Sequence, residues 1–160
     1  MNQNEARDAT IEAARAAELL AAHVERLSNR LRESFPLNAS TIAAWEDDPR
    51  ERLHALLRMY EQLYDLTSRK LFRGFLTLSN EPLEGVSARN QVRRLEALGA
   101  IADASRWFEI GTTRNALVHD YPLDPAAQAE RANRAWKELP DLIRTTRGVI
   151  NAMRAEELIP

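Results

Sequence analysis

The chain of 160 residues is 44% hydrophobic and 29% charged, a balance that is typical of one folded domain and excludes a disordered chain. It contains no cysteine, which excludes disulfides, thiolate metal sites and a cysteine nucleophile. The formal net charge of −2 provides no overall basic field for nucleic acid, and no apolar run reaches the ~18 residues that a membrane span requires.

The first predicted helix runs from about Glu5 to about Glu33. Its apolar residues recur at helical spacing and form one stripe, Leu20, Val24, Leu27 and Leu31. Phe35–Pro36 ends this helix, because the residue before a proline avoids helical geometry, and a short helix over Thr41–Trp45 follows. The N-terminal segment carries acids and lacks the apolar core of a signal peptide, so we expect a cytoplasmic protein.

The second predicted helix begins at Asp48–Pro49 and ends near Asn80. An aspartate N-cap followed by proline at the first helical position is a strong start signal. A third, short helix runs from an N-cap at Ser87 through Leu98, and Gly99 suits the left-handed residue that follows a helix.

The fourth predicted helix covers about Ile101 to Asp120 and is closed by Tyr121–Pro122. Asp124–Pro125 repeats the start signal and opens the last helix. Its apolar stripe continues past Pro140, which predicts either one kinked helix or two nearly collinear ones.

The predicted fold class follows from these elements, because no strand pattern is present. We expect an all-α, up-and-down bundle of four main helices plus a short one. Nothing in the composition divides the chain, so residues 1–160 are predicted to form a single domain.

The fourth helix carries the unusual polar residues. Arg114 falls on the same arc as Trp107 and Val118, where an unpaired charge is expensive. His119 lies about 140° further round the helix, in line with Asn115. Taken singly, Arg114 is more often a structural ion-pair residue, and His119 more often a favourable partner of the helix dipole. Their combination within a few residues is what indicates a site.

The sequence Arg114–Asn115–Ala116–Leu117–Val118–His119 resembles the Arg-x4-His motif of the HEPN superfamily of helical, RNA-cleaving and nucleotide-associated domains. Tyr121, two residues further on, extends it to the Arg-x4-His-x-Tyr pattern of the HepT-like branch, the toxin half of a toxin–antitoxin pair. The pattern of Trp136, Leu139–Pro140 and Leu142 is similar to the last helix of that branch. The resemblance covers roughly residues 50 to 155.

The resemblance implies a homodimer paired about the motif helix, RNA as substrate and cleavage without a metal. In that chemistry His119 accepts the proton of a ribose 2′-hydroxyl, since an imidazole titrates near neutral pH. Arg114 stabilises the charge that builds on the phosphate, and Asn115 orients the imidazole or binds phosphate. The product is a 2′,3′-cyclic phosphate. The resemblance further implies that a cognate minimal nucleotidyltransferase, the antitoxin, adenylylates Tyr121 and silences the nuclease.

Two other interpretations of the same residues remain open. In the first, the chain is a non-catalytic partner or substrate-binding subunit of a small nucleotidyltransferase. In the second, it is a plain helical dimer whose Arg114 is a structural ion-pair residue.

Other residues give weaker indications of function. His23 and His54 belong to no recognised metal-binding motif and are expected to be structural or surface residues. No metal-binding pattern and no glycine-rich phosphate loop is present, so we expect no metal and no cofactor. Two basic clusters are more often solvated helix faces than RNA-binding edges: Arg89, Arg93 and Arg94, and Arg69, Lys70 and Arg73.

Overall fold

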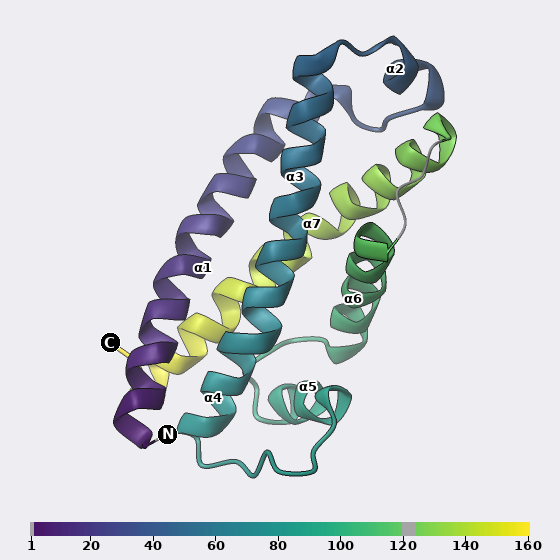
Figure 1. The fold of residues 1–160 in the computed structure, drawn as a ribbon. Coiled ribbons are helices and arrows are strands. Elements are labelled where there is room, and N and C mark those ends of the chain that lie inside the picture. Colours follow the sequence, from purple (N-terminus) through teal and green to yellow (C-terminus); the bar gives the residue numbers. More distant parts are fainter. Residues whose placement is uncertain (1, 120–123) are drawn as a thin grey trace.

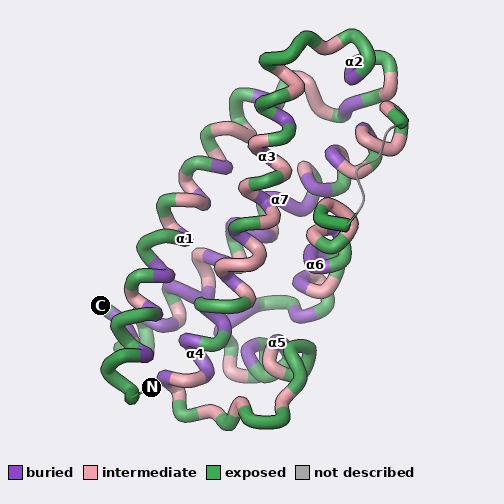
Figure 2. Tube along the Cα trace, in the orientation of Figure 1, coloured by how far each residue is buried: buried purple, intermediate pink, exposed green. Residues whose placement is uncertain are grey.

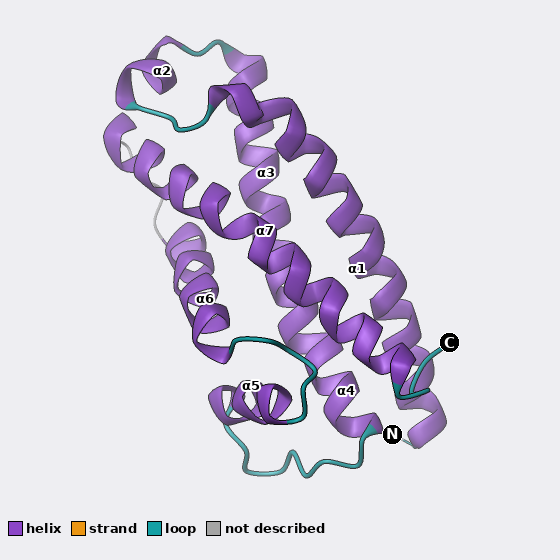
Figure 3. Cartoon of the chain, turned by 180° about the vertical axis from the view of Figure 1, so that it is seen from behind, coloured by secondary structure: helices purple, strands orange, loops and turns teal. Residues whose placement is uncertain are grey.

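The computed structural model describes residues 2–119 and 124–160. In these two ranges every regular element is a helix, and Figures 1 and 3 show the helices packed into one bundle. The elements in chain order are α1 (Gln3–Leu31), the 3₁₀ turn η1 (Arg32–Ser34), α2 (Ala39–Ala44), α3 (Asp47–Leu66), the π-helical turn η2 (Thr67–Leu71), α4 (Phe72–Leu78), α5 (Ala88–Ala97), α6 (Ala104–His119) and α7 (Pro125–Ala155). The all-helical fold class and the bundle are therefore confirmed.

Helix α1 begins two residues before the predicted start because Asn2 caps it. The Asn2 side chain accepts a hydrogen bond from the Glu5 backbone N–H at 2.9 Å, and the Glu5 carboxylate accepts one from the Asn2 N–H at 3.0 Å. This reciprocal capping box satisfies two otherwise unpaired donors. Further along, α1 presents fully buried alanines to the core, Ala17 and Ala21 among them, which permits close approach of α3.

The predicted second helix is continuous from Asp47 to Leu78, but its middle contains the π-helical turn η2. Glu46 rather than Asp48 occupies the N-cap position, so the predicted cap is wrong by two residues. Asp47 and Asp48 instead lie in the first turn, where their charge complements the helix dipole. The π turn directs Thr67 into the core, where its Oγ1 lies 2.7 Å from Thr146 Oγ1 of α7.

Helix α5 follows the prediction. The Ser87 side chain accepts a hydrogen bond from the Asn90 N–H, and Gly99 has φ +76° after the helix ends. Helix α6 begins at Ala104 instead of Ile101, because the Asp103 carboxylate accepts a hydrogen bond from the Arg106 N–H at 3.0 Å and caps the helix there.

Helix α7 is one helix with Pro140 in its interior, not two. Asp124 caps it as predicted, accepting hydrogen bonds from the N–H groups of Ala126 and Ala127. α7 crosses the bundle obliquely in Figures 1 and 3 and packs against α1, α3 and α6. Figure 2 shows the buried segments of the helices turned toward the centre of the bundle. The largest fully buried side chains of this core include Trp107, Tyr60, Phe72 and Phe75.

Within residues 2–119 and 124–160, none of the helices combines the length and apolar character needed to cross a bilayer.

Candidate functional site

Arg114 is anchored by an acid on the neighbouring helix. Its Nη2 lies 2.7 Å from Asp65 Oδ2 of α3, and the two side chains are 16% and 31% exposed. This hydrogen bond is the main reason that the pKa of Arg114 is raised above its ordinary value. The guanidinium is therefore a fixed cation with a set orientation.

Asp65 is the site residue that sequence reasoning missed. It lies 49 positions before Arg114, so no local spacing connects the two. The available signal was indirect: Asp65 is the only acid between Glu61 and Glu81, and a charge on the apolar arc of α6 needs a partner.

Asn115 joins Arg114 from the same helix. Its Oδ1 accepts a hydrogen bond from Arg114 Nη1 at 3.3 Å, and the Asn115 side chain is exposed. Arg114 Nε is buried and finds no acceptor among the described residues. Asp65 and Asn115 thus bind the two Nη atoms of the guanidinium, and the buried Nε–H is left without an acceptor among the described residues.

His119 is the last residue of α6 and is exposed. It ends an outward stripe at helical spacing that also contains Phe108, Thr112 and Asn115. Across residues 2–119 and 124–160, no hydrogen bond or ion pair joins His119 to Arg114, whose bonds go to Asp65 and Asn115. Within one chain the structure therefore brings Arg114, Asn115 and Asp65 together and presents the imidazole separately to solvent.

Tyr121, the predicted adenylylation site, lies outside the described residues. His23 and His54 are exposed on α1 and α3. Among the described residues, no group of three His, Cys, Asp or Glu side chains is placed to hold a metal ion.

A buried polar pair fixes α6 against α3 and α7. Tyr60 Oη donates to Glu138 Oε2 at 2.7 Å and lies 3.3 Å from the Ile110 carbonyl oxygen, and both side chains are buried. Burial, followed by the hydrogen bond to Glu138, raises the pKa of Tyr60. The pair ties three helices together at Ile110, about one helical turn before Arg114.

We expect Tyr60→Phe to lower the free energy of unfolding at pH 7 by about 1–3 kcal/mol, because Glu138 loses its donor while it stays buried. The difference from wild type should shrink above pH ~10: Tyr60 ionises first in the unfolded chain, so the contribution is complete below that pH and is lost as the pH rises. Urea unfolding at pH 7 and pH 10.5 measures both effects, with Tyr64→Phe as the control. A pH-independent difference would contradict this account.

Gly111 permits the close packing of α6 against Tyr64. A Cβ at position 111 would lie 2.6 Å from Tyr64 Oη, and the Tyr64 ring cannot move freely because it stacks on Trp107 with ring centroids 4.8 Å apart. The neighbouring residue Asp65 holds Arg114, so this contact also supports the site.

Gly111→Ala should therefore destabilise the fold by about 1–2 kcal/mol despite the better helix propensity of alanine. Gly148 of α7 provides the matched control, since a Cβ there meets no described atom within 4 Å. We expect Gly148→Ala to stabilise by about 0.5–1 kcal/mol. Thermal unfolding of both variants measures the contrast, and equal shifts of Tm would refute the packing argument.

Comparisons of the chain with protein-family models, with curated proteins and with solved structures yield no match.

Proposed function

We propose that the chain is a metal-independent endoribonuclease that cuts RNA by attack of a ribose 2′-hydroxyl. The observation that carries the proposal is an exposed imidazole, His119, one helical turn beyond Asn115, which itself binds the anchored guanidinium of Arg114. The resemblance of this motif to HepT-like toxins supplies the reaction type.

In the proposed reaction a ring nitrogen of His119 takes the proton of the 2′-hydroxyl. The 2′-oxygen forms a bond to phosphorus, and the bond from phosphorus to the 5′-oxygen breaks. The leaving 5′-oxygen takes a proton from a second imidazole, giving a 2′,3′-cyclic phosphate and a 5′-hydroxyl. Arg114 stabilises the negative charge that builds on the phosphate oxygens.

A second copy of the chain supplies the second imidazole in this proposal. Support comes from Val118, which is 44% exposed on α6 and is one of two exposed large hydrophobic side chains among the described residues. We expect Val118→Glu to weaken pairing of the α6 helices and to lower cleavage with it. Light scattering after size-exclusion chromatography measures the mass, and an unchanged dimer would contradict pairing through α6.

The proposal includes the control step of a HepT-like toxin. A cognate minimal nucleotidyltransferase antitoxin transfers the AMP group of ATP to the Tyr121 hydroxyl oxygen, which loses its proton, and pyrophosphate leaves. The added bulk and negative charge exclude RNA phosphate from the site. Tyr121→Phe should abolish the modification, and AMP found elsewhere in that variant would refute the assignment.

The experiment is incubation of the pure chain with tRNA or mRNA in the presence of a chelator. We expect fragments that end in a 2′,3′-cyclic phosphate, and no cleavage of an oligonucleotide that lacks 2′-hydroxyl groups. Cleavage that stops when metal is removed would refute the proposal.

One observation favours the non-catalytic alternative. The strong pairing of Arg114 with Asp65 also suits a structural arginine on a surface that binds a small nucleotidyltransferase. A stable complex with such an enzyme, combined with no cleavage of any RNA, would favour this alternative.

A further inference from the structure

Positive charge is concentrated in one part of this acidic chain. Residues 67–97, which form η2, α4, α5 and the loop between α4 and α5, contain six basic residues and only three acidic ones, a formal charge of +3. Because the whole chain carries −2, the remaining residues carry −5. We call residues 67–97 the basic lobe.

Most of these cations are not neutralised by neighbours. Arg94 is the exception, since it forms two hydrogen bonds of 2.8 Å to Glu81. No ion pair within residues 2–119 and 124–160 engages four exposed cations of the lobe: Arg69, Lys70, Arg73 and Arg93. Elsewhere on the molecule, Arg106, Arg147 and Arg154 are paired with acids, whereas the exposed Arg15, Arg26 and Arg30 of α1 form no ion pair with a described residue. The lobe therefore presents four cations that no acid among the described residues neutralises.

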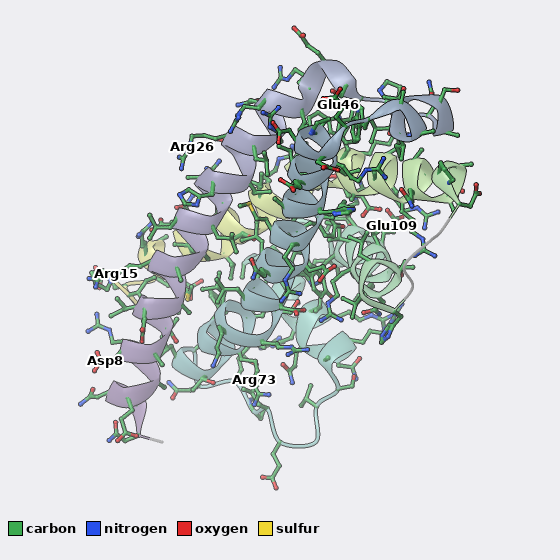
Figure 4. The ribbon with its side chains drawn as sticks, turned by 45° about the horizontal axis from the view of Figure 1, so that its top comes forward. Asp8, Arg15, Arg26, Glu46, Arg73 and Glu109 are labelled. Atoms are coloured by element: carbon green, nitrogen blue, oxygen red, sulfur yellow. The ribbon has the colours of Figure 1, made fainter. Side chains whose placement is uncertain are left out.

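The free cations share a place in the fold. Arg69 and Arg73 are four positions apart on the continuous helix of η2 and α4, and α4 packs against α5, which carries Arg93. Figure 4 shows Arg73 at the far end of the α3–α4 helix from Glu46. The three arginines therefore lie on two helices that pack against each other.

The lobe reaches the candidate site along α6. The Arg89 guanidinium of α5 lies over the Phe108 ring, 4.1 Å from its centroid, and Phe108 begins the outward stripe that ends at His119. Along α6 these two residues are about 16 Å apart, which corresponds to roughly three to five nucleotides of an extended strand.

We propose that the basic lobe binds single-stranded RNA next to the segment that is cut, with the phosphates on Arg69, Arg73 and Arg93 and a base stacked on Arg89. The choice of RNA as the ligand rests on the proposed function. The observation that these cations are unpaired is independent of it. A single strand is favoured because the planar Arg89 group, already ordered on Phe108, offers a stacking surface to an unstacked base.

The test is binding of a fluorescent 12-nucleotide 2′-O-methyl RNA, which has no free 2′-hydroxyl to attack, measured by anisotropy over a series of salt concentrations. The triple variant Arg69→Ala, Arg73→Ala, Arg93→Ala should weaken binding at least ~10-fold and lower the slope of log affinity against log salt by about 2, since each phosphate contact on a single strand contributes ~0.7. These side chains are exposed, so we expect an unchanged Tm.

The matched control removes three exposed arginines from α1, by Arg15→Ala, Arg26→Ala and Arg30→Ala. It should retain most of the wild-type affinity. The proposal would be overturned if both triple variants weakened binding equally, or if neither weakened it.

Arg89→Lys keeps the charge and loses the planar surface, so the affinity for RNA should fall about 3- to 10-fold with the salt slope unchanged. If the wild type bound a 12-base-pair duplex with the same affinity as the single strand, the single-strand assignment would be overturned.

Cleavage of unmodified RNA by the same proteins separates this proposal from the proposed function. If the wild type cuts RNA and the lobe variant binds and cuts equally well, the lobe proposal fails and the nuclease stands. If the wild type binds RNA through the lobe but never cuts it, the lobe proposal stands and the nuclease fails.

Discussion

Replacing His119 by alanine is expected to lower the rate of RNA cleavage by about 10²- to 10⁴-fold, the range that removal of a general base or acid produces. The fold should be unaffected, because the side chain is exposed at the last residue of α6. A loss of cleavage activity without a loss of stability would therefore show that His119 acts in the reaction itself.

The measurement is the single-turnover cleavage rate in a chelator, together with the Tm of each protein. His23→Ala is the control, because it removes another exposed histidine, on α1, and should leave the rate unchanged. If His119→Ala cuts RNA at the wild-type rate, His119 is not the base and the proposed reaction is wrong.

Arg114→Ala is expected to have the second large effect, on two quantities at once. Loss of the guanidinium should lower cleavage by about 10²- to 10³-fold, as removal of a group that stabilises transition-state charge does. It should also lower the free energy of unfolding by about 1–3 kcal/mol, because Asp65 keeps its partly buried place on α3 without a partner. Arg114→Lys retains the charge but cannot bond Asp65 and Asn115 in the same geometry, so it should recover stability better than activity.

The control for the stability effect is Arg134→Ala, which breaks an exposed pair with Glu130 of α7 in which the two side chains are 50% and 74% exposed. It should cost less than about 0.5 kcal/mol. Urea unfolding measures stability, and cleavage is compared at a temperature where every variant is folded. If Arg114→Ala loses stability but keeps full activity, Arg114 is purely structural.

Most of the helix ends that carry local signals could be predicted from the sequence, and one exception is Asp48–Pro49, because Glu46 occupies the N-cap position of α3. Asp124–Pro125, Ser87 and Gly99 act through their own backbone neighbours, and each occupies the expected position. The start of α6 was missed although its cap, Asp103, is a local signal of the same kind, whereas the π turn could not be predicted because it depends on a core contact between Thr67 and Thr146. The apolar stripe reads the same whether or not one turn is π-helical.

The candidate site was predictable only in part. The helical period places Arg114 on the apolar arc and His119 at its edge, and the structure has Arg114 half-buried and His119 exposed. The identity of the arginine's partner, Asp65, depends on how α3 and α6 pack, and helical spacing carries no information about that. The same holds for Tyr60 and Glu138, whose hydrogen bond links two helices across the core.

The most direct test of the account compares four proteins in one assay: the wild type, Arg114→Ala, His119→Ala and the double variant. The measured quantity is the single-turnover rate at which 2′,3′-cyclic phosphate ends form in a chelator. If both residues serve one reaction, the double variant should be no slower than the slower single variant, since groups that act as a unit are not additive. Equal rates for all four proteins would contradict the account.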